Sequence, residues 1–164
     1  MKTLVVLLSL LICMPALAQD TATVRATDRI VAGIRREAKE AEHFRWLMSH
    51  FQVYRIDTAL TLIRHRSKSA PGDLIENYYL KDGALVYYTR EALKPYLYGK
   101  DTALLGCYYF GGGRLKHRVV YEVGPQPGLA EVEKGILARY YSALARFQAY
   151  QERSQSSKVK SQKR

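Results

Sequence analysis

The sequence predicts an α+β domain: an N-terminal helix, an antiparallel β-meander of about five or six strands, and a long C-terminal helix packed on one sheet face. Three observations lead to this prediction. Apolar residues recur at helical spacing near both ends of the chain, whereas residues in the middle alternate with a period of two. Two similar stretches, each with a tight-turn signal, predict two hairpins in one sheet. Helices that flank a run of strands are typical of the α+β class.

The chain begins with the features of a secretory signal peptide. Lys2 precedes an apolar run of about nine residues that ends at Ile12, and a small-residue cleavage site ends at Ala18. We therefore expect residues 1–18 to be cleaved and the protein to be exported to the periplasm or the cell exterior. The apolar run is too short to cross a hydrocarbon core of ~30 Å as a helix, so we expect no transmembrane segment in the mature chain.

The two cysteines raise separate questions. Cys13 ends the apolar run, so a lipid-anchored form is an alternative to simple export. The residue before a lipidated cysteine is normally small, however, whereas here it is Ile12. Cleavage after Ala18 would leave Cys107 without an intramolecular partner. The neighbours of Cys107 belong to a strand pattern, which favours a buried thiol over one that pairs with another chain.

Basic residues dominate the charge of the chain. The formal net charge is +11, and it falls to +10 for the 146 residues after the predicted cleavage site, because Lys2 is the only charged residue before it. A balance of this size favours anionic partners such as phosphate-bearing polymers, acidic glycans, membrane surfaces or acidic proteins. Solubility alone is the alternative explanation. No motif supports specific nucleic-acid recognition.

The first predicted elements are a flexible lead, a helix and strands. Residues 19–27 are small and polar, and predict the flexible lead. A helix is expected from Asp28, which can cap its first turn, to about Ser49. An apolar stripe at helical spacing supports it: Ile30, Ile34, Ala38, Ala41, Phe44 and Met48. From Phe51 the period of two predicts strands. Residues 64–73 contain a Pro-Gly pair and predict a loop.

Two stretches, NYYLKDGALVYY and CYYFGGGRLKHR, predict twin β-hairpins. The predicted turns are Asp82-Gly83 and Gly112-Gly113, because residues at the centre of tight hairpins need positive φ. Between the hairpins, residues 89–101 predict short helical turns around a proline. The twin hairpins explain why the chain repeats one short pattern: both lend the same face to one core.

The hairpins also resemble those of small exported bacterial domains of unknown function, in which a leading helix precedes a sheet with YYFxxGxL hairpins. The resemblance covers roughly residues 28–122 and rests on two eight-residue matches, Tyr78 to Leu85 and Tyr108 to Leu115. The GGG at 111–113 departs from the pattern and loosens the register of the second turn. The resemblance implies a fold and no activity.

The C-terminal part predicts one helix and a tail. An apolar stripe at helical spacing extends from about Leu129 to Tyr150. Residues 151–164 are basic and contain one aliphatic residue, so they predict a disordered tail. The single α+β domain is therefore expected to cover residues 28–150.

The predicted anion site follows the second hairpin turn. Arg114, Lys116 and Arg118 are two residues apart, so a regular strand places their side chains on one face. Tyr109 is expected opposite Lys116. A row of cations beside an aromatic ring can pair with phosphates or carboxylates and stack a flat group. A secondary basic group lies in the predicted loop: Arg64, Arg66 and Lys68. Solvated side chains without a ligand are the alternative for both groups.

The sequence predicts no catalytic set and no metal site. The histidines lack the spacing of a chelating pair, and no serine lies in a nucleophile elbow. Cys107 and His117 fall on opposite faces in the predicted register, which argues against a thiol–imidazole pair.

We therefore expect a non-enzymatic exported binding or accessory protein, without a cofactor, that holds an anionic envelope component or an acidic protein. The alternatives are an inhibitor or immunity protein against an acidic secreted or periplasmic enzyme, and an enzyme that uses His117 or Cys107. The sequence does not predict an oligomeric state.

Overall fold

The computed structural model describes residues 21–69, 72–96, 99–122 and 125–162. It confirms the predicted α+β class, with an N-terminal helix, an antiparallel meander and a long C-terminal helix, α2 (Leu129–Gln162). Over the described residues the sheet has seven strands rather than five or six, and they pair in chain order. The strands are β1 (Lys39–Trp46), β2 (Ser49–Ile56), β3 (Ala59–Ser69), β4 (Gly72–Lys81), β5 (Ala84–Tyr96), β6 (Gly99–Gly111) and β7 (Arg114–Val120).

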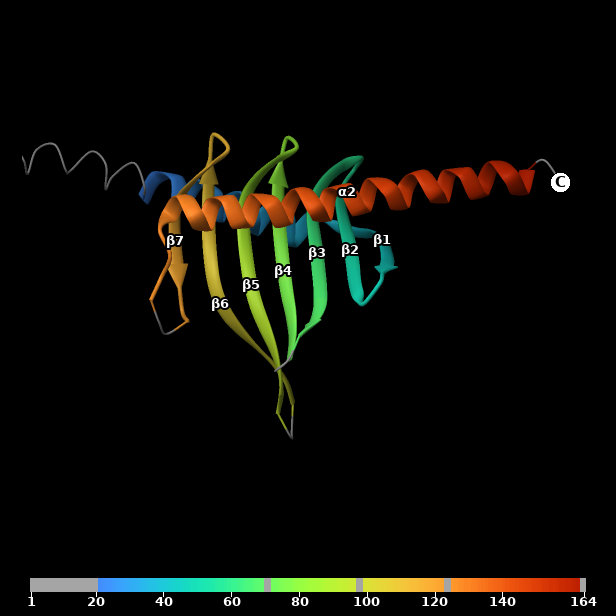
Figure 1. Ribbon diagram of the computed structural model, residues 1–164. Coiled ribbons are helices and arrows are strands. Elements are labelled where there is room, and N and C mark those ends of the chain that lie inside the picture. The colour runs from blue at the N-terminus through green and yellow to red at the C-terminus, as the bar shows by residue number, and fades with distance from the viewer. Residues whose placement is uncertain (1–20, 70–71, 97–98, 123–124, 163–164) are drawn as a thin grey trace, which may run out of the picture.

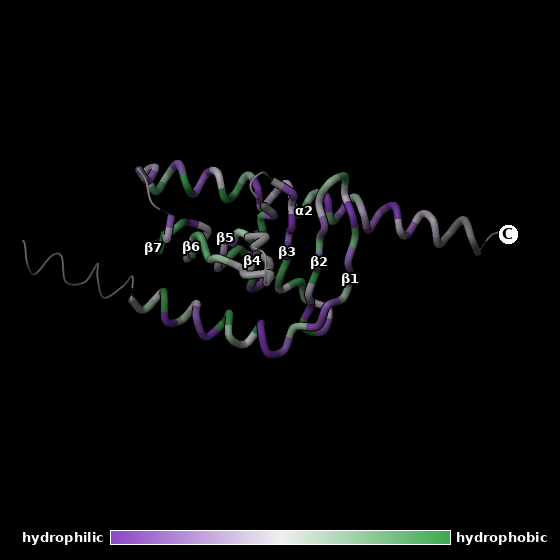
Figure 2. The backbone as a smooth tube through the Cα atoms, turned by 90° about the horizontal axis from the view of Figure 1, so that it is seen from below, coloured by the Kyte–Doolittle hydropathy of each residue, from purple (hydrophilic) through white to green (hydrophobic). Residues whose placement is uncertain are grey.

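The two helices cover opposite faces of the sheet, so the domain has three layers. Figure 1 shows α2 in front of the strands and the helix over 21–37 behind them, and Figure 2 shows the sheet between the two. α2 buries Ile136, Tyr140 and Phe147 in one core cluster. The other helix buries Val31 and Ile34 in a second cluster. The sequence predicted a helix on one face only.

The Tyr-Tyr pairs supply one aromatic ring to each face of the sheet. Because side chains alternate along a strand, neighbouring tyrosines point to opposite sides. Three rings pack in the cluster under α2: Tyr78, Tyr88 and Tyr108. Three others pack in the cluster under the helix over 21–37: Tyr79, Tyr87 and Tyr109. The repeats therefore serve two cores, and the expectation that both hairpins lend one face to one core was wrong.

A β-bulge in each twin hairpin shifts the predicted register. Both turns form as expected, with positive φ at both central residues. In the second hairpin Phe110 pairs with Leu115, but the register then shifts. Tyr109 consequently pairs with His117 rather than with Lys116. The first hairpin carries the same kind of shift. A bulge adds one residue to one strand, and turn chemistry alone does not reveal it.

The first helix lies earlier in the chain than predicted. It covers 21–37, and so includes most of the expected flexible lead, where Val24 packs against the core and Thr27 is buried. The expected helical stretch near Ser49 is instead the β1–β2 hairpin. From residue 42 onward, polar and aromatic side chains alternate with a period of two. Phe44 faces the core cluster under α2, and this pairing with the sheet overrides the weaker helical stripe.

Three further expectations on secondary structure were wrong. The predicted loop over 64–73 belongs largely to β3 and β4, and the described residues of the predicted helical turns, 89–96 and 99–101, belong to β5 and β6. Pairing with neighbouring strands supplies the backbone hydrogen bonds in both cases. The predicted disordered tail is helical as far as Gln162, and Figure 1 shows this end of α2 projecting past β1.

Candidate anion-binding cleft

β3 passes from the core into an open part of the sheet. Its side chains alternate, so Leu62, Arg64, Arg66 and Lys68 belong to the same face. Leu62 packs in the cluster under the helix over 21–37, whereas the three basic residues lie beyond that cluster and line a cleft. The structure therefore brings the predicted secondary basic group together, on a strand rather than in a loop.

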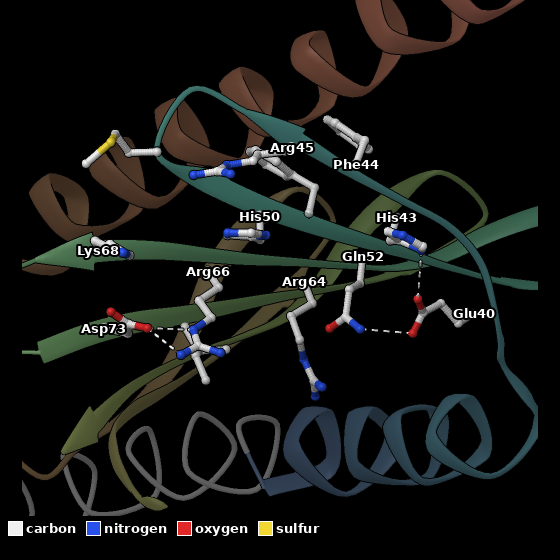
Figure 3. A pocket seen from close by; sticks show the side chains of 13 residues that line it. Glu40, His43, Phe44, Arg45, His50, Gln52, Arg64, Arg66, Lys68 and Asp73 are labelled. Carbon is white, nitrogen blue, oxygen red and sulfur yellow. Dashed lines mark hydrogen bonds and ion pairs between the residues drawn. The ribbon is translucent and has the colours of Figure 1, made fainter. Parts of the chain in front are cut away.

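The cleft lies over β1 to β4, beside the helix over 21–37 (Figure 3). Its volume is about 560 Å³, which is within the range of ~300–1,000 Å³ that is usual for small-molecule sites. The residues that line it are Glu40, His43, Phe44, Arg45, Met48, His50, Phe51, Gln52, Arg64, Arg66, Lys68, Asp73 and Ile75.

Cations outnumber carboxylates in the cleft. Its lining includes four lysine or arginine side chains and only two carboxylates, those of Glu40 and Asp73. Asp73 accepts a hydrogen bond from Nε of Arg66 at 2.7 Å. Glu40 accepts one from the amide nitrogen of Gln52 at 2.9 Å and lies 3.7 Å from His43 (Figure 3). Both carboxylates are thus already engaged.

Three cleft side chains have no such partner. Within the part of the chain that the structure describes, Arg45, His50 and Lys68 make no ion pair and no hydrogen bond through their side chains, and all three are exposed. Figure 3 shows them along the upper side of the cleft. An unpaired arginine or lysine in an open cleft can bind an anion without first breaking an internal contact.

Contacts with Asn77 and Tyr54 hold the Arg64 side chain in place. Its Nε donates to the side-chain oxygen of Asn77 at 2.7 Å, and its guanidinium lies 6.0 Å from the ring centre of Tyr54. Asn77 is 1% exposed and donates to Thr89 at 3.0 Å and to Glu91 at 2.8 Å. This network fixes the direction of the arginine, which reduces the entropy lost when a ligand binds.

The structure does not bring the predicted primary site together. Arg114 donates from Nε to Glu133 of α2 at 2.8 Å, and the backbone nitrogen of Leu115 donates to the same carboxylate at 2.7 Å. Arg118 donates to the carbonyl oxygen of Pro127, just before α2, at 2.7 Å. Both arginines are therefore engaged with the α2 side of the domain.

Lys116 and Tyr109 lie on the other side. The Lys116 stem packs beside Gly111 near the helix over 21–37, and Tyr109 belongs to the core cluster under that helix. The bulge in β7 causes this separation, because it breaks the alternation on which the predicted row depended. The four residues consequently form no common surface.

The bulge also changes the relation between Cys107 and His117. His117 pairs with Tyr109, two residues from Cys107, so both lie on the same face and the predicted separation was wrong. Burial raises the pKa of the Cys107 thiol, although its hydrogen bond with Tyr87 acts in the opposite direction. The thiol is buried and His117 packs 5.7 Å from the Tyr109 ring, an arrangement that suits a protonated core cysteine.

The face under α2 holds a buried carboxylate that was not predicted from the sequence. Glu76 is 3% exposed and accepts hydrogen bonds from Tyr88 at 2.6 Å and from Arg139 at 3.0 Å, with His65 Nδ1 at 3.1 Å. Burial alone would raise the pKa of Glu76, but the contacts with His65, Tyr88 and Arg139 outweigh it and lower that pKa. An acidic residue inside a strand of apolar and aromatic residues was the signal available in the sequence.

Several cleft residues were also missed. Arg45 and His50 fell in or beside the predicted helix, and Gln52 and Asp73 were not assigned a role. The signal was the alternation in HFRW and HFQV, which places the aromatic residues toward α2 and the polar ones toward the cleft. The two stretches pair as one hairpin, so their polar faces become a single surface.

Comparisons with known proteins give no match: no family model fits the chain, and no curated protein or solved structure is significantly similar to it. Among the described residues, no helix is both long and apolar enough to cross a bilayer. The same residues include no group of three or more histidine, cysteine, aspartate or glutamate side chains that could hold a metal ion.

Proposed function

We propose that this chain is an exported, non-enzymatic binding protein that holds an anionic ligand of the cell envelope in the cleft over β1 to β4. The observation that carries the proposal is the imbalance of charge in the cleft, where Arg45 and Lys68 are unpaired among the described residues and the two carboxylates are engaged. The net charge of +10 that is expected after cleavage acts in the same direction by attracting anions toward the molecule.

The chemistry of the lining suits phosphate or carboxylate groups. Arginine presents a planar fork that can donate two parallel hydrogen bonds to such a group, and lysine adds a mobile point charge. Arg64 supplies a positioned fork, whereas Arg45 and Lys68 can adjust to the ligand. The open shape of the cleft allows one segment of a long polymer to enter it.

Binding of soluble polyphosphate to protein without residues 1–18 tests the proposal. This truncation leaves every described core residue in place, because the two clusters extend from Val24 to Tyr150. The cleft variant carries Arg45→Gln, Arg64→Gln and Lys68→Gln. Each cation near a polyanion contributes roughly 1 kcal/mol, so we expect the Kd to rise by at least about tenfold.

A variant with the same loss of charge is the control. It carries Arg29→Gln, Lys81→Gln and Lys134→Gln, three exposed residues outside the cleft that make no ion pair among the described residues. The proposal expects this variant to bind within about twofold of the unsubstituted protein. Equal weakening in both variants would reduce the binding to a diffuse effect of net charge, and absence of binding by the unsubstituted protein would contradict the proposal.

A further inference from the structure

The β1–β2 turn exposes two apolar side chains at the rim of the cleft. Leu47 is 81% exposed and Met48 is 66% exposed, and Met48 also lines the cleft. Most other large apolar side chains of the described strands are buried against the rest of the domain. These two extend into solvent and contribute little to the core.

Leu47 also occupies an unfavourable backbone conformation. Its φ is 55°, in the left-handed region that a bulky side chain rarely adopts. The other positive-φ residues of the described turns are aspartate or glycine: Asp57, Asp82, Gly83, Gly112 and Gly113. A glycine or asparagine would serve the turn better, so stability of the fold does not explain a leucine here. Such strain at an exposed position points to a role in contact with a partner.

Cations flank this turn on both faces of the hairpin. Arg45 and His50 pair across β1 and β2 just before and after the turn, and both belong to the cleft. On the opposite face, the Arg153 guanidinium lies 4.8 Å from the ring centre of Trp46. The turn therefore combines a small apolar tip with a basic surround.

We propose that this turn inserts into an anionic phospholipid surface, with Leu47 at the boundary of the acyl chains and the cleft cations on the lipid phosphates. The inference rests on the proposed function, because it identifies the anionic ligand of the same cleft. A lipid surface fits better than an acidic protein, because two isolated side chains supply much less apolar area than a stable protein interface of ~1,200 Å² requires. A bilayer accepts small apolar tips one by one and presents many phosphates beside them.

The single tryptophan of the chain, Trp46, reports on the position of the turn. The test mixes protein without residues 1–18 with vesicles of phosphatidylglycerol and phosphatidylcholine, and repeats the measurement with brominated acyl chains. We expect binding to the anionic vesicles, weak binding to phosphatidylcholine alone, and quenching of Trp46 by the brominated lipid. Leu47→Gly should weaken vesicle binding by about fivefold to tenfold, and its affinity for soluble polyphosphate should be unchanged.

Tyr141→Ala is the matched control, because Tyr141 is 60% exposed on α2 and lies outside the cleft. It should bind vesicles like the unsubstituted protein. Unchanged vesicle binding by Leu47→Gly, or vesicle binding without quenching of Trp46, would overturn the inference. Polyphosphate binding without vesicle binding would overturn it as well and leave the proposed function intact, in favour of a soluble polymer or an acidic protein. If the unsubstituted protein bound neither polyphosphate nor anionic vesicles, both proposals would be contradicted.

Discussion

One face of the sheet has two parts, which meet on β3 and differ in the chemistry of their side chains. Under the helix over 21–37, the side chains form an apolar and aromatic cluster: Leu62, Tyr79, Tyr87, Cys107 and Tyr109. Beyond that helix, the same face carries polar and cationic side chains: Arg45, His50, Gln52, Arg64, Arg66 and Lys68. β3 contributes to both parts, and its residues change from apolar to basic within two positions.

This difference separates the features that serve folding from those that are free for binding. In the covered part, the helix removes apolar area from water, and substitutions should affect stability. In the open part, a polar face is expected of any exposed sheet, and substitutions of its cations should affect anion binding more than stability. The free energy of unfolding should therefore respond strongly to substitutions in buried parts of the domain and weakly to substitutions in the open part.

The first prediction compares one residue from each part. Tyr87 is 7% exposed and packs between Tyr79 and Tyr109, with ring centres 5.5 and 4.9 Å away. Tyr87→Ala should lower the free energy of unfolding by about 4 kcal/mol, because it leaves a large cavity. Arg66→Ala should lower it by less than about 1 kcal/mol, since the ion pair of Arg66 with Asp73 is partly exposed. Urea unfolding of both variants measures the difference, and equal losses would contradict the division.

The second prediction concerns the buried carboxylate under α2. Glu76→Gln should lower the free energy of unfolding by about 3 kcal/mol near neutral pH, because it disrupts a buried, charge-assisted network with Tyr88 and Arg139. The contacts hold the pKa of folded Glu76 below its unfolded value of about 4.3. The stabilising contribution of Glu76 is therefore present at pH values above its unfolded pKa. It is lost as the pH falls through the lower pKa of the folded state.

Unfolding measurements between neutral and acidic pH check this linkage. The difference between the unsubstituted protein and Glu76→Gln should be constant above the unfolded pKa and should shrink as the pH falls below it. A difference that grows toward acidic pH would show that the pKa of Glu76 is raised rather than lowered in the folded protein.

The third prediction links the two parts of the face. Asn77→Ala should lower the free energy of unfolding by about 2 kcal/mol, because Thr89 and Glu91 lose a buried donor. It should also weaken polyphosphate binding, because Arg64 loses the acceptor that orients it. Urea unfolding and titration with polyphosphate measure both effects. A loss of stability without any change in affinity would show that the position of Arg64 does not matter for binding.

The sequence was sufficient for the fold class and for the two turns of the twin hairpins. The stripe in α2 and the Asp82-Gly83 signal depend on local chemistry, so they could be predicted from a single chain. The β1–β2 hairpin could not be predicted in this way, because its aromatic positions also fit a helical period. Only contacts with α2 and with β3 decide between the two patterns.

The candidate site was harder to predict than the fold. A row such as Arg114, Lys116 and Arg118 shares a face only if the strand is regular, and one bulge in β7 disperses it. Arg64, Arg66 and Lys68 have the same spacing and do share a face, because β3 continues without a shift beside β4. The coverage of a face by a helix depends on tertiary packing, so the sequence could not show which basic group remains open.

The most direct test of the cleft as the anion-binding site is to locate a bound anion by NMR. Titration of isotope-labelled protein with short polyphosphate chains should shift amide resonances mainly in β1 to β4 around the cleft, with resonances of β7 nearly unchanged. This result would place the anion on the open part of the face. Shifts centred on Arg114 and Arg118, or shifts spread evenly over the basic residues of the chain, would contradict the assignment of the cleft as the binding site.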